Sequence, residues 1–142
     1  MELLREYLDF AIFGILGLMG FISLWLTIER LIYYRSIDLD KYQHGAHLNI
    51  DITRNLTALS IIGSNAPFVG LLGTVVGILI TFYDIGQSQN IETGAIMTGL
   101  ALALKATAAG IGIAIPTIMF YNGLMRKVDV LNALHRAKNT KN

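Results

Sequence analysis

Charged residues are almost absent from three long stretches of the chain, and these stretches set the expected architecture. The three stretches are residues 10–28, 56–83 and 93–125. A helix needs about 20 apolar residues to cross the hydrocarbon core of a bilayer, and each stretch is close to this length or longer. The pattern predicts an all-α membrane protein with three transmembrane helices. Their expected positions are residues 10–28, 66–83 and 94–120.

Apolar residues also recur at helical spacing before the second span and after the third, so these two helices are expected to extend into the cytoplasm. The residues of these stripes are Ile52, Leu56, Leu59 and Ile62, then Leu124, Val128, Leu131 and Leu134. Asn49 or Asp51 is expected to cap the first of the extensions, and Pro67 to start the second span. Segments 29–65 and 121–142 are thus predicted to be amphipathic helical segments outside the membrane.

Lysine and arginine are unevenly distributed between the segments outside the spans, which predicts the orientation of the chain. Segment 29–65 contains four of them and segment 121–142 contains five, whereas loop 84–93 contains none. Basic residues concentrate on the cytoplasmic side of membrane proteins. We therefore expect the N-terminal arm (1–9) and loop 84–93 to be periplasmic, and the two basic segments to be cytoplasmic.

Composition narrows the possible functions. Of the 142 residues 54% are hydrophobic, the formal net charge is +1 and cysteine is absent. Disulfides, zinc–thiolate sites and thiol nucleophiles are therefore excluded, and so low a charge gives no reason to expect a nucleic-acid partner. His44 and His47 are spaced as a metal-binding pair, but with no third ligand nearby solvated polar side chains are expected. No catalytic constellation is recognisable, so neither an enzyme nor a bound metal or cofactor is expected.

Small residues occur at regular spacing in the second and third spans. The residues expected to pack helices together are Gly70, Gly73 and Gly77 in span two and Gly110, Ala114 and Pro116 in span three. Helices in lipid gain no hydrophobic energy by meeting, so their association depends on close backbone approach through small residues. Three helices offer few surfaces for this many small residues, which favours a homo-oligomer. Packing within a single monomer is the alternative.

Lys105 is the charged residue within the third span. At 1.5 Å per residue it lies about 16 Å along the helix from Gly94, near mid-membrane. Placing lysine there costs about 3 kcal/mol, so such a residue normally has a partner. No acidic residue of this chain is obviously within reach, and a carboxylate from another chain is the preferred partner. A neutral amine, or a hydrogen bond to backbone carbonyls of a neighbouring subunit, remains open.

Two segments resemble the motifs of the ExbB/TolQ/MotA proton-channel family, and within it the ExbB branch. They are APFVGLLGTVVGI (66–78) and GLALALKATAAGIGIAIPTIMFYN (99–122). The order and orientation of the spans agree with this resemblance. It implies a location in the bacterial inner membrane and a homo-oligomeric ring, pentameric in the family. Spans two and three would face a lumen that holds ExbD-like single-span helices, each with a membrane aspartate.

The same resemblance implies that the proton motive force energises TonB-dependent uptake across the outer membrane. Thr74 and Thr107 match functional threonines of the family, and Thr81 extends the hydroxyl-bearing side of span two. Leu102 stands where members commonly carry glutamate, and Lys105 follows three residues later, so Lys105 is expected to face the partner's aspartate as its cationic counterpart. Lys105 and Thr107 point about 160° apart and cannot both face one lumen. A TolQ-like role in envelope maintenance and a non-conducting scaffold for a partner helix are the alternatives.

Overall fold

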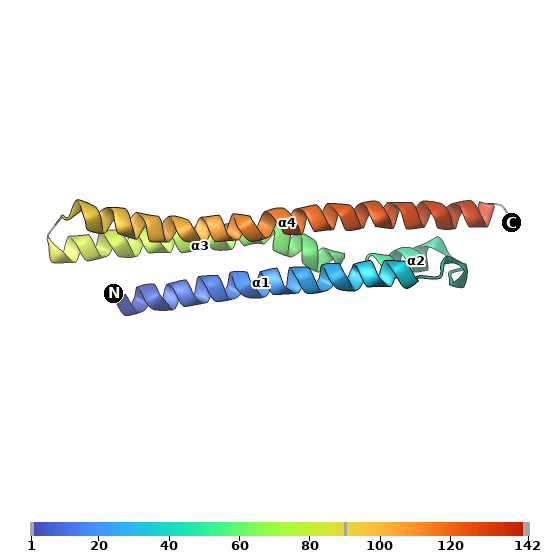
Figure 1. Ribbon diagram of the computed structural model, residues 1–142, viewed down its shortest axis with the longest axis horizontal. Helices are drawn as coiled ribbons and strands as arrows, with labels where there is room; N and C mark the ends of the chain where they lie inside the picture. The colour runs from blue at the N-terminus through green and yellow to red at the C-terminus, as the bar shows by residue number, and fades with distance from the viewer. Residues whose placement is uncertain (1, 90, 141–142) are drawn as a thin grey trace.

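A computed structural model describes residues 2–89 and 91–140, and every regular element in this part of the chain is helical. The elements are α1 (Glu2–Ser36), the 3-10 helix η1 (Leu39–Lys41), α2 (Gly45–Ile52), α3 (Leu56–Ser88) and α4 (Thr93–Thr140). Figure 1 shows the three long helices lying side by side, with α3 along the first half of α4. The short α2 lies near the C-terminal end of α1.

The helices α1, α3 and α4 are each long and apolar enough to cross a membrane. Many of their large apolar side chains are exposed, among them Phe10 (84%), Phe21 (64%) and Leu79 (63%). Such extensive exposed apolar surface is rare on soluble monomers, and helices are one of the two structures that satisfy their backbone groups within lipid. The prediction of an all-helical chain with three long apolar spans is therefore confirmed.

The N-terminal arm and the first span are one continuous helix. The sequence pattern separates residues 1–9 from 10–28, whereas α1 begins at Glu2 and ends at Ser36. No proline interrupts this stretch, so the helix has no reason to break at the expected boundary. Asp38 then stops the chain from continuing as an α-helix, because its carboxylate accepts a 3.0 Å hydrogen bond from the Asp40 amide and caps η1.

The prediction that Asn49 or Asp51 caps a helix is wrong. Both residues lie inside α2, whose N-cap is His44. The chain breaks after α2, and α3 begins directly after Asn55, which adopts a left-handed conformation with φ 68°. Asparagine tolerates this conformation better than most residues do. The break between the two helices therefore falls at Asn55, and the expected single cytoplasmic extension of span two is two helices.

Pro67 does not start a helix, contrary to the prediction. It lies in the interior of α3. Proline has no amide hydrogen, so the carbonyl of Gly63, four residues earlier, loses its partner in the helix. Figure 1 shows the first part of α3, drawn in green, bending toward α1, as is usual at an internal proline. This bend brings Leu56 and Leu59 into the first of the two apolar clusters described next.

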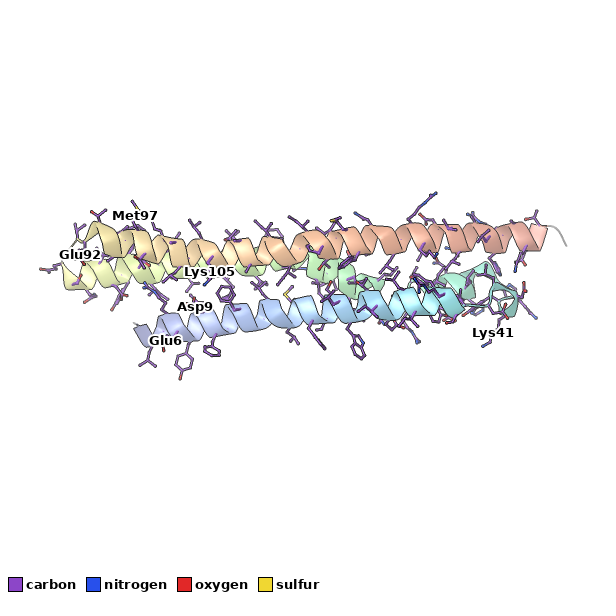
Figure 2. The ribbon with its side chains drawn as sticks, in the orientation of Figure 1. Glu6, Asp9, Lys41, Glu92, Met97 and Lys105 are labelled. Carbon is purple, nitrogen blue, oxygen red and sulfur yellow. The ribbon has the colours of Figure 1, made fainter. Side chains whose placement is uncertain are left out.

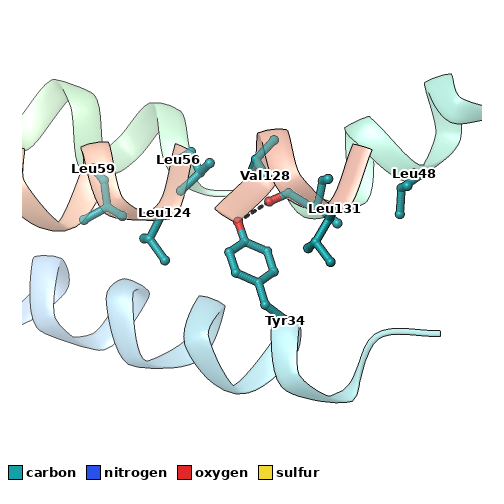
Figure 3. Close-up of a cluster of buried hydrophobic side chains, with 8 residues drawn as sticks. Tyr34, Leu48, Leu56, Leu59, Leu124, Val128 and Leu131 are labelled. Carbon is teal, nitrogen blue, oxygen red and sulfur yellow. Dashed lines mark hydrogen bonds between the residues drawn. The ribbon is translucent and has the colours of Figure 1, made fainter. Parts of the chain in front are cut away.

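Two clusters of buried apolar side chains join the helices. One of them, shown in Figure 3, unites α1, α2, α3 and the second half of α4. Its members are Tyr34, Leu48, Ile52, Leu56, Leu59, Leu124, Val128 and Leu131. The Tyr34 hydroxyl donates to the Ile52 carbonyl and so ties α1 to the end of α2. The second cluster, between α1, α3 and the first half of α4, consists of Ile12, Leu16, Ala66, Ala106 and Ala114.

The apolar stripe of the tail ends one turn earlier than the sequence suggests. Leu134 is 51% exposed, whereas its neighbour His135 is 2% exposed. The residue that follows Leu131 on the same face of the helix is the one four positions later, and that residue is His135. Its Nε2 lies 2.7 Å from the Tyr42 carbonyl, so the buried ring is hydrogen-bonded to the connection between η1 and α2.

Candidate functional site

The hydroxyl groups of Thr74 and Thr107 meet in the contact between α3 and α4, at 7% exposure for Thr74. Thr74 Oγ1 also lies 2.8 Å from the Ala103 carbonyl and donates to it. A hydroxyl carries one proton. Both hydroxyls also lie within hydrogen-bond distance of the Gly70 carbonyl, at 3.3 Å for Thr74 and 3.5 Å for Thr107. The result is a short chain of hydrogen bonds in an otherwise apolar contact.

Small residues bring α3 and α4 close enough for these bonds to form. A Cβ atom on Gly70 would overlap the Ala106 carbonyl oxygen, and one on Gly110 would lie 2.5 Å from the Ala66 carbonyl oxygen. The other predicted packing positions differ in their burial. Gly73, Gly77 and Ala114 are buried, and Pro116 is exposed in α4. The backbones of the two helices are thus in direct contact around the threonines.

Thr81 lies in the same contact between α3 and α4, closer to the turn that joins them. It is 3% exposed, and Gly99 of α4 leaves room for its side chain. The Arg5 guanidinium donates a 2.9 Å hydrogen bond to Thr81 Oγ1 and lies 3.8 Å from the Asp84 carboxylate. Sequence reasoning missed Arg5. Its one signal was that it is the lone basic residue of the N-terminal arm.

Lys105 lies on a different side of α4 from Thr107. Its side chain is directed at α1, where Nζ is 6.0 Å from the centre of the Phe13 ring. Within residues 2–89 and 91–140 Lys105 forms no salt bridge. Leu102 is 39% exposed. The structure therefore brings Thr74 and Thr107 together and separates Lys105 from them.

A second polar cluster, which sequence reasoning missed, lies where α1 meets α2. The Arg30 guanidinium is 3% exposed and donates to both carboxylate oxygens of Glu29 (2.5 and 2.6 Å) and to the Asp51 carbonyl (2.8 Å). It also lies 4.4 Å from the centre of the Tyr33 ring, at cation–π distance. In the sequence Arg30 is one of several basic residues after the first span, and nothing there distinguishes it.

Tyr42 extends this cluster to the connection between η1 and α2. Its hydroxyl donates a 2.6 Å hydrogen bond to the Asp51 carboxylate and lies 3.1 Å from the Tyr33 hydroxyl. The bond to Asp51, with that to Tyr33, raises the pKa of Tyr42 well above its usual value, because both stabilise the protonated phenol. The cluster fastens α2 against α1.

Nothing in the described part of the chain assembles a metal site. His44 and His47 have ring centres 5.9 Å apart. No group of three histidine, aspartate or glutamate residues is close enough there to hold an ion. The polar chemistry of the described spans therefore consists of hydroxyl groups and a few charged side chains.

Comparison with known proteins gives the family. Residues 36–136 match the MotA/TolQ/ExbB proton channel family. The chain is 51% identical to the biopolymer transport protein ExbB of Helicobacter pylori (strain J99), over 99% of this chain and 97% of the relative. It is 48% identical to the protein of the same name from Aquifex aeolicus (strain VF5), over 90% and 86% of the two chains.

A third relative is the putative biopolymer transport protein ExbB-like 2 of H. pylori (strain 26695), 45% identical over 90% of this chain and 85% of the relative. The relatives thus match along nearly their whole length. The family match takes in all of α3 and most of α4, the helices that carry the threonine contact. The chain belongs to the MotA/TolQ/ExbB proton channel family.

Proposed function

We propose that this protein is an ExbB-like proton-channel subunit of the bacterial inner membrane, which uses the proton motive force to energise TonB-dependent uptake across the outer membrane. Membership of the proton channel family and about 50% identity to proteins named ExbB support this proposal. The proposed orientation has the N-terminal end of α1 and loop 84–93 on the periplasmic side. Segments 29–65 and 121–142, which are rich in lysine and arginine, are in the cytoplasm.

Several copies of the chain, five by analogy with the family, form a ring around ExbD-like single-span helices. Each of these helices carries a membrane aspartate. The energy released by proton flow is passed on to TonB. Part of α4 supports contact with a further helix. Ala108 and Gly112 are exposed, and a Cβ atom on Gly112 would meet nothing within 4 Å. Small-xxx-small pairs of this kind are typical of helix–helix contacts in membranes.

The observation that carries the proposal is the hydrogen-bonded chain from Thr107 through Thr74 to the Ala103 carbonyl. A hydroxyl both donates and accepts, so it can hydrogen-bond a carboxyl group in either protonation state. We assign Thr74 and Thr107 to the ion pathway or to contact with the partner's aspartate. Thr81 is a third hydroxyl of this interface, and the half-exposed Leu102 is a contact for the partner helix.

Proton flux into liposomes containing this chain and its single-span partner tests the assignment. We expect Thr107→Val and Thr74→Val to lower flux by about tenfold, which corresponds to a barrier increase of about 1.4 kcal/mol. Thr98→Val is the matched control, because Thr98 is an exposed threonine of α4. Flux of both interface variants equal to that of Thr98→Val would show that the two hydroxyls have no part in conduction.

One observation favours a non-conducting scaffold as the second candidate. Leu102 occupies the place where the resemblance leads one to expect a carboxylate, and an aliphatic side chain cannot carry a proton. Wild-type flux equal to that of protein-free liposomes would establish the scaffold. A TolQ-like protein would conduct protons in the same way but would serve envelope maintenance. A deletion strain that keeps TonB-dependent uptake and loses envelope integrity would establish that role instead.

A further inference from the structure

None of the salt bridges within residues 2–89 and 91–140 includes Lys105. A charge in so apolar a helix nevertheless needs compensation. Its ammonium group is directed at α1, 6.0 Å from the centre of the Phe13 ring. An aromatic ring alone compensates a cation only in part. A charge deep in a membrane helix normally has an acidic partner or water. The acidic residues of α1 on the side that faces Lys105 are therefore the first place to look.

The contacts between α1 and α4 fix which residues share a depth. Ser23 forms a 2.8 Å hydrogen bond with Thr117, and Gly20 lies against Ile113. The two helices run in the same direction. Moving from these two contacts toward the N-terminus by equal numbers of residues in both helices places Asp9 at the depth of residues 102 and 103 of α4. Asp9 is thus offset from Lys105 by about three residues, or about 4.5 Å along the axis.

Side-chain direction reduces this offset. In an α-helix side chains lean toward the N-terminus, so the long Lys105 side chain extends from its own position toward the depth of Asp9. Asp9 lies one turn before Phe13 and on the same face of α1. Both are partly buried. Figure 2 shows Asp9 on the side of α1 that faces α4, and Lys105 on the side of α4 that faces α1.

The other charged groups nearby are accounted for. Arg5, one turn before Asp9, is bound to Thr81 and lies 3.8 Å from Asp84. Glu6 is exposed. Asp9 forms no salt bridge among those recorded for residues 2–89 and 91–140. An unpaired carboxylate and an unpaired ammonium group therefore occupy the same α1–α4 boundary.

We propose that Lys105 and Asp9 form an ion pair within one chain, beside the Phe13 ring, and that this pair fastens α1 to the first half of α4. Lys105 is then a positioning residue for α1 and is not the cationic counterpart of the partner's aspartate. The proposal goes beyond the proposed function and does not depend on proton conduction. A carboxylate supplied by the partner helix is the competing outcome of the tests below.

Cysteine cross-linking tests the proximity directly, because the chain has no cysteine of its own. Asp9→Cys is combined with Lys105→Cys and treated in native membranes with a short bis-maleimide. We expect a cross-link within one chain, identified by mass spectrometry of the digested monomer band. Asp9→Cys with Met97→Cys is the control, because Met97 is 63% exposed on the side of α4 that faces away from α1. No link, or only linked dimers, would overturn a pair within one chain.

A double-mutant cycle tests the charge interaction in the purified complex. We expect Asp9→Leu and Lys105→Leu each to lower the Tm by several degrees, and the double variant to lower it no further than either single change. The exchanged pair Asp9→Lys with Lys105→Asp is expected to recover much of the loss. Glu6→Leu, at the exposed acid of the same helix, is the control. Additive losses would overturn the proposal, as would rescue of Lys105→Leu only by a change in the partner protein's aspartate.

Discussion

Thr107 and Thr74 are joined by a hydrogen bond between their hydroxyl groups across the contact between α3 and α4. The bond forms in a place where the two backbones touch through glycine and alanine. Both helices are therefore held in one register by packing and by hydrogen bonding at the same point.

This relationship predicts different effects of isosteric and conservative changes at Thr107. Thr107→Val removes the hydroxyl and keeps the shape, so we expect the free energy of unfolding to fall by about 1 kcal/mol. Thr107→Ser keeps the hydroxyl and is expected to lose less. The measurement is thermal or detergent-induced unfolding of the purified protein. A Val variant as stable as the wild type, with the loss confined to Ser, would indicate that the methyl group, and not the bond to Thr74, matters.

The glycine contacts predict a sharp dependence on position. Gly110→Ala places a Cβ atom 2.5 Å from the Ala66 carbonyl oxygen, so the backbones must separate. We expect a loss of about 1–3 kcal/mol and a weaker Thr74–Thr107 bond. Gly14→Ala in α1, where a Cβ atom meets nothing within 4 Å, is the control and is expected to be neutral or slightly stabilising. A stable Gly110→Ala protein would contradict the close contact.

The Arg30 cluster predicts a large effect for one arginine and a small one for its neighbour. Arg30→Met removes the donor to the Asp51 carbonyl and leaves Glu29 without its partner. We expect a loss of about 2 kcal/mol, moderated because the Glu29 side chain stays 38% exposed. Arg35→Met, at an exposed arginine of the same helix, serves as the comparison. Similar unfolding midpoints for the two variants would contradict a structural role for Arg30.

The hydrogen bonds of Tyr42 predict that the stability of the folded protein depends on pH in the alkaline range. Its pKa is raised in the folded protein by its bonds to Asp51 and Tyr33. Its stabilising contribution is thus fully present below the pKa of an unfolded tyrosine, about 10. It is lost as the pH rises through the folded pKa. Wild type should exceed Tyr42→Phe in stability by about 1 kcal/mol at pH 7, and this advantage should shrink above pH 10. An advantage that stays constant with pH would contradict the bond to Asp51. Tyr7→Phe, at an exposed tyrosine of α1, is the control.

The long helices and their buried stripes can be predicted from sequence, because helical periodicity and membrane thickness both constrain which residue types occur at each position. Leu56, Leu59, Leu124 and Val128 are buried, as the spacing of apolar residues indicates. Close approach of helices follows in the same way from glycines four residues apart, but their spacing favours contacts between subunits, whereas Gly70 and Gly110 pack α3 against α4 of one chain. Each of these features depends on residues within one helix or on a general property of lipid.

The placement of α1 could not be predicted, because that helix is apolar on nearly every side and no pattern says which side meets α4. The contacts of Arg5 with Thr81 and of Lys105 with Phe13 both depend on that placement. The break at Asn55 depends on the conformation of one residue. Proline is common at helix starts, so the sequence predicts a start at Pro67, whereas tertiary packing keeps it inside α3. These features come from tertiary packing and single backbone angles, on which hydrophobic pattern carries no information.

The unbroken course of α4 has a mechanical consequence. The helix continues through Pro116 for 48 residues, which corresponds to a length of about 70 Å, more than twice the hydrocarbon thickness of about 30 Å. A rod of this kind transmits torque. A change in the orientation of its first half, around Thr107, would therefore reach the tail around Leu131 and His135 through one continuous helix.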